Sequence, residues 1–236
     1  MRLHRFYFSE KIGDKKNIKI SSPEQVNQIR RVFRMKTGDM IVLFDGSGFD
    51  YKCQILDFEK DKILLSVASS EKSRYMPERD IYLCASVVKK DTFEWIVEKA
   101  TELGVTNIVP IIAERSEKKN LNFERLNIIA IEASEQCGRG NVPKIHEMIS
   151  LFDSIKYFKE KNNVRLVAYH TEASEKKLDF MNEKKSIAIF IGPEGGWNSD
   201  EIQLFHSANF EVKNLGQQIF RAETAVICAI FSVVSL

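Results

Sequence analysis

Ile187-Ala188-Ile189-Phe190-Ile191 is an apolar run, and Gly192-Pro193-Glu194-Gly195-Gly196-Trp197 follows it directly. The run predicts a strand buried on both faces, because apolar and polar residues do not alternate along it. The glycines let the backbone of the following loop approach a ligand without a Cβ atom in the way, and Pro193 stiffens the start of the loop. Ligands of open α/β sheets bind beyond the carboxyl ends of strands. The stretch therefore predicts a ligand-binding loop at the edge of a sheet.

A second candidate loop lies closer to the C-terminus. Residues 215–221 follow a predicted strand, 211–215, and precede a predicted apolar helix, 224–235. Neither loop contains G-x-x-x-x-G-K-[ST] or G-x-G-x-x-G, which disfavours kinases, other nucleoside triphosphatases and dinucleotide-dependent dehydrogenases. A tight structural turn is sufficient to explain one such loop. Two loops after neighbouring strands favour a ligand pocket.

From residue 81 onward, predicted strands alternate with predicted helices. The strands are expected at 81–88, 105–112, 164–169, 186–191 and 211–215, and the helices at 91–103, 122–137, 199–208 and 224–235. We expect Asp91 to cap the first helix and Gly104 to end it, and we expect Asn198 or Ser199 to cap the third. The alternation predicts an α/β domain with a largely parallel sheet.

The N-terminal part has a different pattern. Short strands are predicted at 40–44, 49–55 and 62–67, with helical spacing at 23–33. Several short strands within about 70 residues are typical of a small β-barrel. The polar stretch 69–79 contains Pro77 and predicts a linker. We therefore expect two domains, 1–72 and 73–236.

Charge is distributed unevenly, although the net charge is only +2. Residues 1–36 contain ten basic residues and three acidic ones. This excess is typical of a surface that binds phosphates, and a solvated basic surface is the alternative.

The four cysteines form no C-x-x-C pair. We expect them to be reduced, small apolar residues and we expect no metal site. No apolar segment follows Met1 as in a signal peptide, and the longest apolar run is too short to cross a bilayer. These features favour a cytoplasmic protein without a membrane partner.

Several segments occur in an order that is characteristic of one protein family. They are Arg5-Phe6-Tyr7, Arg31-Val32-Phe33-Arg34, Gly38-Asp39, Phe44-Asp45-Gly46, Lys89-Lys90-Asp91, and residues 94–105, 111–116, 132–139, 142–143, 191–197, 215–216 and 221–225. Together they closely resemble the RsmE family over essentially the whole chain. Members of this family are SPOUT-class enzymes that methylate N3 of a uridine in the 16S ribosomal RNA of the small subunit.

The resemblance implies a fold, a cofactor and partners. The fold is an α/β, trefoil-knotted SPOUT domain with a parallel sheet, preceded by a PUA-like β-barrel that binds RNA. The cofactor is S-adenosyl-L-methionine. The partners are 16S ribosomal RNA in the small ribosomal subunit and a second copy of the chain, because SPOUT proteins usually act as homodimers.

The resemblance also implies site residues. The cofactor would be bound by residues of three segments: Thr171, Ile191, Gly192, Glu194, Gly195, Gly196, Leu215, Gly216, Ile219 and Phe220. RNA would be bound by five arginines: Arg5, Arg30, Arg31, Arg34 and Arg139.

Methyl transfer to a uridine nitrogen requires the acceptor to be positioned in line and its N3 proton to be removed or shared. Arg221 is the candidate that stabilises the uridine anion or holds a phosphate. Glu223 is a candidate base or orients Arg221, and stabilisation of a helix N-terminus is its alternative role. Gln217 and Gln218 depart from the family pattern, which has an arginine at the second of these positions.

Two other functions remain open from the sequence. One is a SPOUT methyltransferase with another RNA target, and the other is a non-catalytic RNA-binding factor for ribosome assembly. The glycine loop argues against the second function, because such a factor would not need a cofactor pocket.

Overall fold

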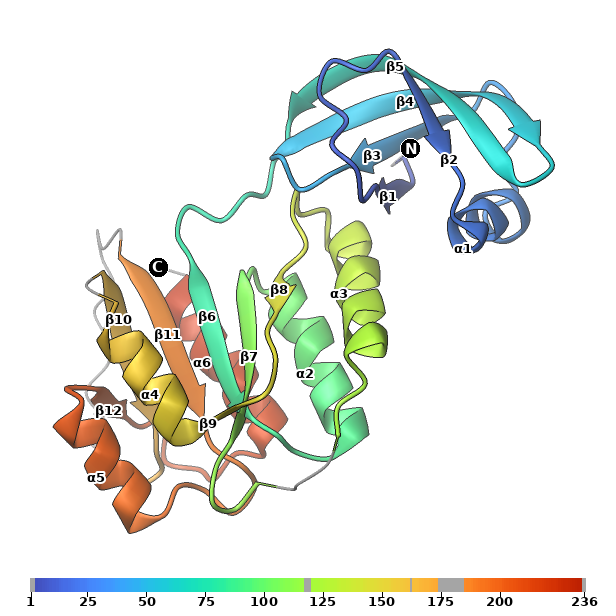
Figure 1. Cartoon of the computed structure of the whole chain (residues 1–236). Helices are drawn as coiled ribbons and strands as arrows, with labels where there is room; N and C mark the ends of the chain where they lie inside the picture. Colours follow the sequence, from blue (N-terminus) through green and yellow to red (C-terminus); the bar gives the residue numbers. More distant parts are fainter. Residues whose placement is uncertain (1–2, 117–119, 162, 174–184, 235–236) are drawn as a thin grey trace. The chain divides into compact units, whose positions relative to one another are not determined.

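The computed structural model describes residues 3–116, 120–161, 163–173 and 185–234. Contacts divide the chain into two compact units. The first comprises Met1–Met76 and Ser134–Val142, and the second comprises Pro77–Ala133 and Pro143–Leu236. Figure 1 labels the elements of both units.

A five-stranded sheet forms the frame of the first unit. Its order is β1-β3-β4-β5-β2, with β1 parallel to β3 and the other neighbours antiparallel. The strands are β1 (Arg5–Tyr7), β2 (Asn17–Ile20), β3 (Met40–Phe44), β4 (Phe49–Glu59) and β5 (Lys62–Lys72). The short helix α1 (Pro23–Asn27) continues into a π-helical turn, η1 (Gln28–Val32). Alternating strand residues such as Tyr51, Cys53 and Ile55 are buried and pack with Phe6 and Ile29 in one core.

The segment 69–72 was predicted to begin a linker, and the structure corrects this prediction. β5 continues to Lys72, which pairs with Phe49 at the start of β4. Backbone N–H and C=O groups of the long strand β4 need partners along its length, and the extension of β5 provides them.

Residues 134–142 join the first unit although they lie far along the chain. Glu135 accepts a hydrogen bond from the backbone N–H of Tyr7 at 2.8 Å. The N–H of Gly140 donates to the carbonyl oxygen of Tyr75 at 3.1 Å. The chain therefore passes between the two units more than once.

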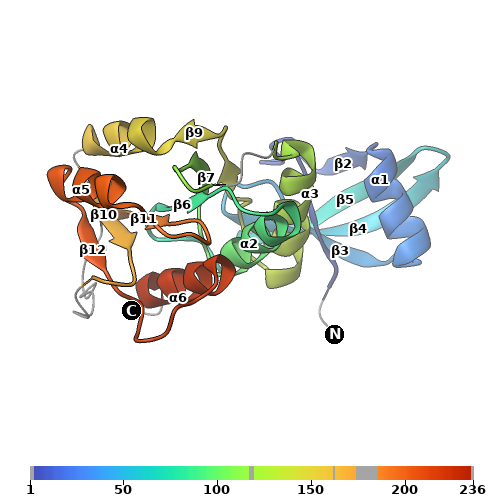
Figure 2. The same ribbon diagram turned by 90° about the horizontal axis from the view of Figure 1, so that it is seen from below.

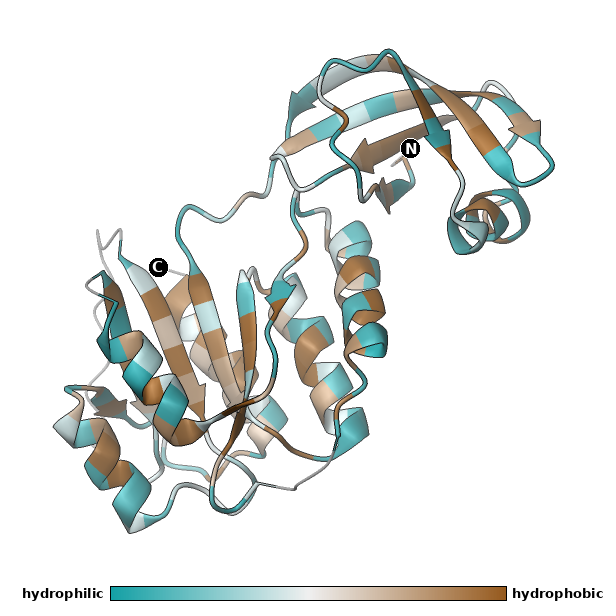
Figure 3. Ribbon diagram, viewed as in Figure 1, coloured by the Kyte–Doolittle hydropathy of each residue, from teal (hydrophilic) through white to brown (hydrophobic). Residues whose placement is uncertain are grey.

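The second unit is built on a seven-stranded, parallel sheet. Its order is β12-β10-β11-β6-β7-β8, and β9 also pairs with β7. The strands are β6 (Ile81–Ser86), β7 (Asn107–Ile112), β8 (Lys144–Ile145), β9 (Ile149–Ser150), β10 (Val164–Tyr169), β11 (Ser186–Ile191) and β12 (Glu211–Lys213). The predicted parallel α/β arrangement is confirmed. Figure 3 shows how apolar β11 is, as expected of a strand in the middle of a covered sheet.

Helices cover both faces of this sheet. They are α2 (Lys90–Glu102), α3 (Phe123–Cys137), α4 (Leu151–Lys159), α5 (Ser199–Ser207) and α6 (Ala222–Val234). Figure 2 shows α4 and α5 on one face and α2 and α6 on the other. Phe158 of α4 and Phe205 of α5 both pack against Phe190 of β11 in a buried aromatic cluster.

Helix termini agree with the sequence predictions in part. Asn198 caps α5 and forms a capping box with Glu201, as predicted. Gly104 has φ +91° just beyond the end of α2, which suits a residue without Cβ. The prediction that Asp91 caps α2 is wrong, because the helix begins at Lys90 and Asp91 lies in its first turn. Helix α4, capped by Ser150, was not predicted.

Candidate functional site

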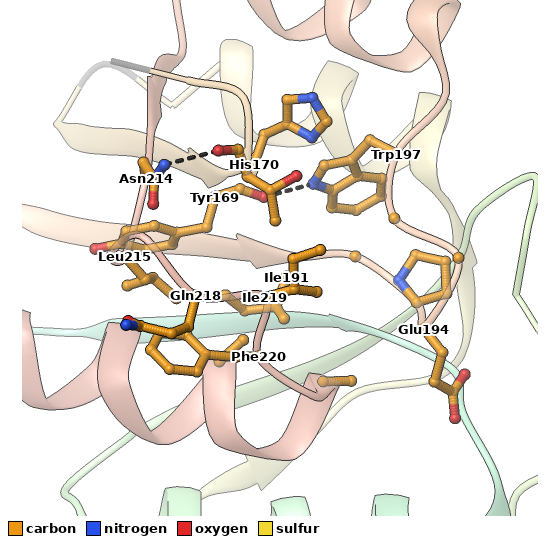
Figure 4. A pocket seen from close by; sticks show the side chains of 17 residues that line it. Tyr169, His170, Ile191, Glu194, Trp197, Asn214, Leu215, Gln218, Ile219 and Phe220 are labelled. Atoms are coloured by element: carbon orange, nitrogen blue, oxygen red, sulfur yellow. Dashed lines mark hydrogen bonds between the residues drawn. The ribbon is translucent and has the colours of Figure 1, made fainter. Parts of the chain in front are cut away.

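Three loops meet beyond the carboxyl ends of β10, β11 and β12. These strands are neighbours in the order β12-β10-β11 and run parallel, so their carboxyl ends share one edge of the sheet. A cavity of about 290 Å³ lies there (Figure 4). It is lined by Tyr169, His170, Thr171, Ile191, Gly192, Pro193, Glu194, Gly195, Gly196, Trp197, Asn214, Leu215, Gln218, Ile219, Phe220, Ala222 and Ala225.

Trp197 closes one side of the glycine loop. Its side chain is buried, and its Nε1 donates to the carbonyl oxygen of Tyr169 at 2.9 Å (Figure 4). A Cβ atom on Gly192 would lie 3.2 Å from a carbon of the Trp197 ring. The indole therefore packs where a side chain at Gly192 would be, and glycine keeps the backbone of the loop close to the ring.

The loop turns sharply before helix α5. The N–H of Gly196 donates to the carbonyl oxygen of Pro193 at 2.8 Å, and Gly196 has φ +66°. Glycine adopts this left-handed conformation without the strain that other residues incur. The turn presents backbone groups of residues 192–196 along the cavity.

Asn214 connects two of the three loops. Its Nδ2 donates to the carbonyl oxygen of Thr171 at 2.7 Å (Figure 4). Its Oδ1 accepts from the N–H of Gly216 at 2.7 Å. The sequence prediction missed this residue. The available signal was a polar Asx residue near the end of the predicted strand 211–215, because Asn side chains often bond to the backbone two residues on.

Nine of the ten residues predicted to bind the cofactor line this cavity. The tenth, Gly216, follows Leu215 in the chain and has its N–H held by Asn214. Eight lining residues were absent from the prediction: Tyr169, His170, Pro193, Trp197, Asn214, Gln218, Ala222 and Ala225. Tyr169 and His170 were missed because the sequence identified only one residue, Thr171, of the third loop. The other six lie in or beside the two predicted loops.

Arg221 and Glu223 lie at the start of α6, next to residues that line the cavity. The carbonyl oxygen of Arg221 accepts from the N–H of Ala225 at 2.9 Å, so Arg221 stands at the start of the helix. Its side chain is exposed, and Glu223 is half-buried in the first helical turn. Ala222 lies between them and lines the cavity.

The five predicted RNA-binding arginines have different environments, all in the first unit. Arg31 and Arg34 are exposed. Arg30 is half-buried, donates to the carbonyl oxygens of Glu59 and Lys60, and lies over the Phe58 ring.

Arg5 and Arg139, which are also predicted to bind RNA, are engaged inside the first unit. Arg5 forms an ion pair with Asp50, its side chain is 9% exposed, and it also donates to the carbonyl oxygen of Arg139 at 3.1 Å. Arg139 is 4% exposed, and burial lowers the pKa of its guanidinium to about 10. A phosphate binds an accessible guanidinium, so the exposed Arg31 and Arg34 are the stronger candidates for phosphate contacts.

Within the ranges that the structure describes, no group of three or more His, Cys, Asp or Glu side chains could hold a metal ion. In the same ranges, none of the helices has both the length and the apolar character needed to cross a membrane.

Two family models match the chain. The model of an RNA methyltransferase domain matches residues 76–234. The model of an RNA methyltransferase PUA domain matches residues 22–68. The two matches together span most of both units.

Relatives from several bacteria are similar over nearly the full chain. The ribosomal RNA small subunit methyltransferase E of Rickettsia conorii is 32% identical, with 99% of this chain and 96% of that protein covered. The protein of the same name from Bacillus subtilis is 30% identical, with 89% and 87% covered. A ribosomal RNA small subunit methyltransferase E from Neisseria gonorrhoeae, solved with S-adenosylmethionine bound, has a TM-score of 0.91 and 27% identity, with 99% and 98% covered.

Proposed function

Because this chain belongs to the RNA methyltransferase family whose domain model matches its residues 76–234, we propose that it methylates 16S ribosomal RNA with S-adenosyl-L-methionine as methyl donor. The acceptor is N3 of a uridine in the small ribosomal subunit. The observation that carries the proposal is the cavity beyond β10, β11 and β12, where three loops meet. A ribosomal RNA substrate implies that the protein acts in the cytoplasm.

The lining of the cavity suits the proposed cofactor. The cavity volume of about 290 Å³ is close to the lower end of small-molecule sites. Ile191, Leu215 and Phe220 provide apolar walls, and the glycine loop provides accessible backbone groups. The cofactor supplies a methyl group on a sulfonium, already activated for transfer. The proposed cofactor-binding residues are Thr171, Ile191, Gly192, Glu194, Gly195, Gly196, Leu215, Gly216, Ile219 and Phe220.

Arg221 and Glu223 are the proposed catalytic residues. The guanidinium of Arg221 holds the uridine as its N3 proton leaves, since a cation favours the anion that forms. The carboxylate of Glu223 accepts that proton or orients Arg221. Their positions on either side of Ala222, which lines the cavity, support this assignment.

We also infer the knotted topology that the SPOUT resemblance implies. In such a knot, the loops after the last strands thread through one another and form the cofactor pocket. The loop 192–197 and residues of the loop 214–220 line one cavity, which supports this arrangement.

RNA binding is proposed for the first of two domains, 1–72 and 73–236. The exposed residues Arg31 and Arg34 would contact phosphates, with Arg30 beside them in sequence. Such contacts position the RNA and provide affinity that depends on salt.

A homodimer is the proposed assembly. Helix α6 exposes Phe231 at 60% and Val234 at 45%, although it is largely apolar. Burial of these side chains against a second copy would remove apolar surface from water. Sedimentation equilibrium of the full chain tests this, and a monomer at micromolar concentration would contradict it.

Methyl transfer to small ribosomal subunits that lack the modification tests the proposed function. We expect N3-methyluridine to appear in the 16S ribosomal RNA, as detected by mass spectrometry of nucleosides. Methylation of another nucleoside would identify a different RNA target. An assembly factor without catalysis predicts neither methylation nor binding of S-adenosylmethionine in calorimetry.

A further inference from the structure

Arg115 contacts the glycine loop from outside the cavity. It lies in the turn after β7, and β6 separates β7 from β11 in the sheet. Its Nη1 donates to the carbonyl oxygen of Gly195 at 2.7 Å. A Cβ atom on Gly195 would lie 3.1 Å from Cδ and 3.3 Å from Cβ of Arg115. The aliphatic part of Arg115 therefore passes where a side chain at position 195 would lie.

Glu201 ties the same turn to the end of the loop. Its side chain is only 6% exposed. One carboxylate oxygen accepts from the N–H of Glu114 at 2.8 Å, and the other accepts from the N–H of Asn198 at 2.9 Å. The carboxylate lies in the first turn of α5, where the helix dipole also favours a negative charge. One buried group thus joins two segments that are far apart in sequence.

The turn that carries Arg115 is itself closed by hydrogen bonds. The N–H of Ala113 donates to Oγ of Ser116 at 2.9 Å, and the N–H of Ser116 donates to the carbonyl oxygen of Ala113 at 3.1 Å. The backbone of Arg115 is therefore held between β7 and Ser116. A held backbone lets the side chain act as a fixed support for Gly195.

We propose that Arg115 and Glu201 are positioning residues that hold residues 192–198 in the conformation that binds the cofactor. Neither side chain lines the cavity. A loop with three glycines has many backbone conformations to lose on ordering. Apparent affinity falls with the fraction of molecules whose site is in the binding conformation. The inference rests on the proposed function, because it concerns the affinity of that site for S-adenosylmethionine.

Calorimetric titration of the full chain with S-adenosylmethionine tests this inference. We expect Arg115→Ala to weaken binding about tenfold, as for the loss of one charged hydrogen bond. Arg115→Lys should recover part of the affinity, because an ammonium can still donate to the Gly195 carbonyl. Arg125→Ala is the matched control, since Arg125 is exposed in the same unit and pairs with Glu94 on α2. We expect the control to bind as the wild type does.

Kinetics separate positioning from a role in the chemical step. For Arg115→Ala, we expect KM for S-adenosylmethionine to rise about tenfold while kcat at saturating cofactor stays within about twofold of the wild-type value. A fall in kcat with unchanged KM would overturn the inference. A wild-type chain that binds no S-adenosylmethionine would overturn the proposed function and this inference with it. Wild-type binding that Arg115→Ala leaves undiminished would overturn only the inference.

A double-mutant cycle tests the contact between Arg115 and Gly195 directly. In the wild type, a methyl group at position 195 must displace the Arg115 side chain, so we expect Gly195→Ala to weaken cofactor binding. In Arg115→Ala the methyl group meets fewer atoms, so the same change should weaken binding less. Effects that simply add would contradict the proposed contact.

Glu201→Gln gives a second, independent test. An amide nitrogen in place of one carboxylate oxygen would face a backbone N–H donor and lose that hydrogen bond. We expect weaker cofactor binding in a chain whose far-ultraviolet circular dichroism shows that it is folded. A folded Glu201→Gln variant with wild-type affinity would contradict the role of Glu201.

Discussion

Arg31 and Arg139 carry the same guanidinium in opposite surroundings. Arg31 is exposed, whereas Arg139 is 4% exposed and burial lowers the pKa of its guanidinium. Arg115 has a third kind of surroundings, because it is exposed and also donates a hydrogen bond to the backbone of the glycine loop. The function of each arginine therefore follows from its contacts and exposure rather than from its charge.

Two substitutions, Arg221→Ala and Glu223→Gln, test the proposed catalytic roles of these residues. Removal of a cation that stabilises developing charge typically lowers kcat about 100-fold or more. We expect that loss for Arg221→Ala and a loss of about tenfold or more for Glu223→Gln. Single-turnover methylation of small subunits measures both, with calorimetry confirming that the cofactor still binds. Full rates in both variants would show that other groups carry the chemistry.

Gly192→Ala tests the close packing of the glycine loop on Trp197. The added methyl group would meet the ring at 3.2 Å, so either the loop or the indole must shift. Overpacking of this kind typically costs about 1–3 kcal/mol, which corresponds to about 5- to 160-fold weaker cofactor binding if the shift disturbs the cavity.

Gly104→Ala is the control for this prediction. It introduces strain at φ +91°, well separated in sequence from the cavity loops. It should lower the melting temperature and leave cofactor affinity unchanged. Equal affinity of Gly192→Ala and the wild type would refute the packing argument.

Strand β8 shows how a minimal element is held at the edge of the sheet. It has two residues, and its pairing with β7 is extended by His146, whose N–H donates to the carbonyl oxygen of Ile108 at 2.9 Å. The imidazole Nε2 lies 2.8 Å from Oδ1 of Asn107 on β7. The side-chain contact of His146 thus adds to the few backbone hydrogen bonds that a strand as short as β8 can form with β7.

His146 should make the stability of the chain depend on pH. Burial lowers the pKa of its imidazole, and the nearby charges of Lys144 and Lys161 lower this pKa further. Below a pH of about 6.5 the unfolded chain gains a proton that the folded chain does not, so the free energy of unfolding falls as the pH decreases. One group changes the free energy of unfolding by at most about 1.4 kcal/mol per pH unit. This change ends once the pH falls below the pKa of His146 in the folded chain.

Urea denaturation of the wild type and of His146→Gln between pH 7.5 and 5 measures this contribution. We expect the stability advantage of the wild type over the variant to shrink toward low pH. His206→Gln, which removes an exposed histidine of α5, is the control for loss of a histidine. Parallel curves for the wild type and His146→Gln would rule out this source of pH dependence.

The whole molecule combines two units whose segments are interleaved along the chain. Residues 134–142 belong to the unit formed mainly by Met1–Met76, and the cavity belongs to the other unit. The proposed RNA-binding arginines and the proposed cofactor pocket therefore lie in different units.

Salt dependence of RNA binding tests this division of roles. Each phosphate contact adds about 0.7 to 0.9 to the slope of log affinity against log salt concentration. We expect Arg31→Gln combined with Arg34→Gln to reduce the slope by about one for each arginine that contacts a phosphate. Affinity for S-adenosylmethionine should not change.

Arg125→Gln removes an exposed arginine of the second unit and is the control, so its slope should equal that of the wild type. Filter binding to a 16S ribosomal RNA fragment at several salt concentrations gives the slopes. An unchanged slope in the Arg31 and Arg34 variant would show that these residues do not bind the RNA.

Local patterns in the sequence predicted the central strands, the glycine loop and the cap at Asn198. These features depend on residues within a few positions of one another. The pattern of apolar residues and the preferences of capping residues are therefore sufficient to find them. The two-residue strands β8 and β9 escaped prediction because so short a segment has no periodicity.

Tertiary structure alone decided which distant residues meet. The bond from Asn214 to Thr171, the support of Gly195 by Arg115, and the engagement of Arg5 with Asp50 all join residues more than 40 positions apart. The order of strands in the sheet brings such residues together, and hydrophobic periodicity does not encode that order. The sequence therefore determined that a ligand loop exists, whereas the fold determined what holds the loop in place.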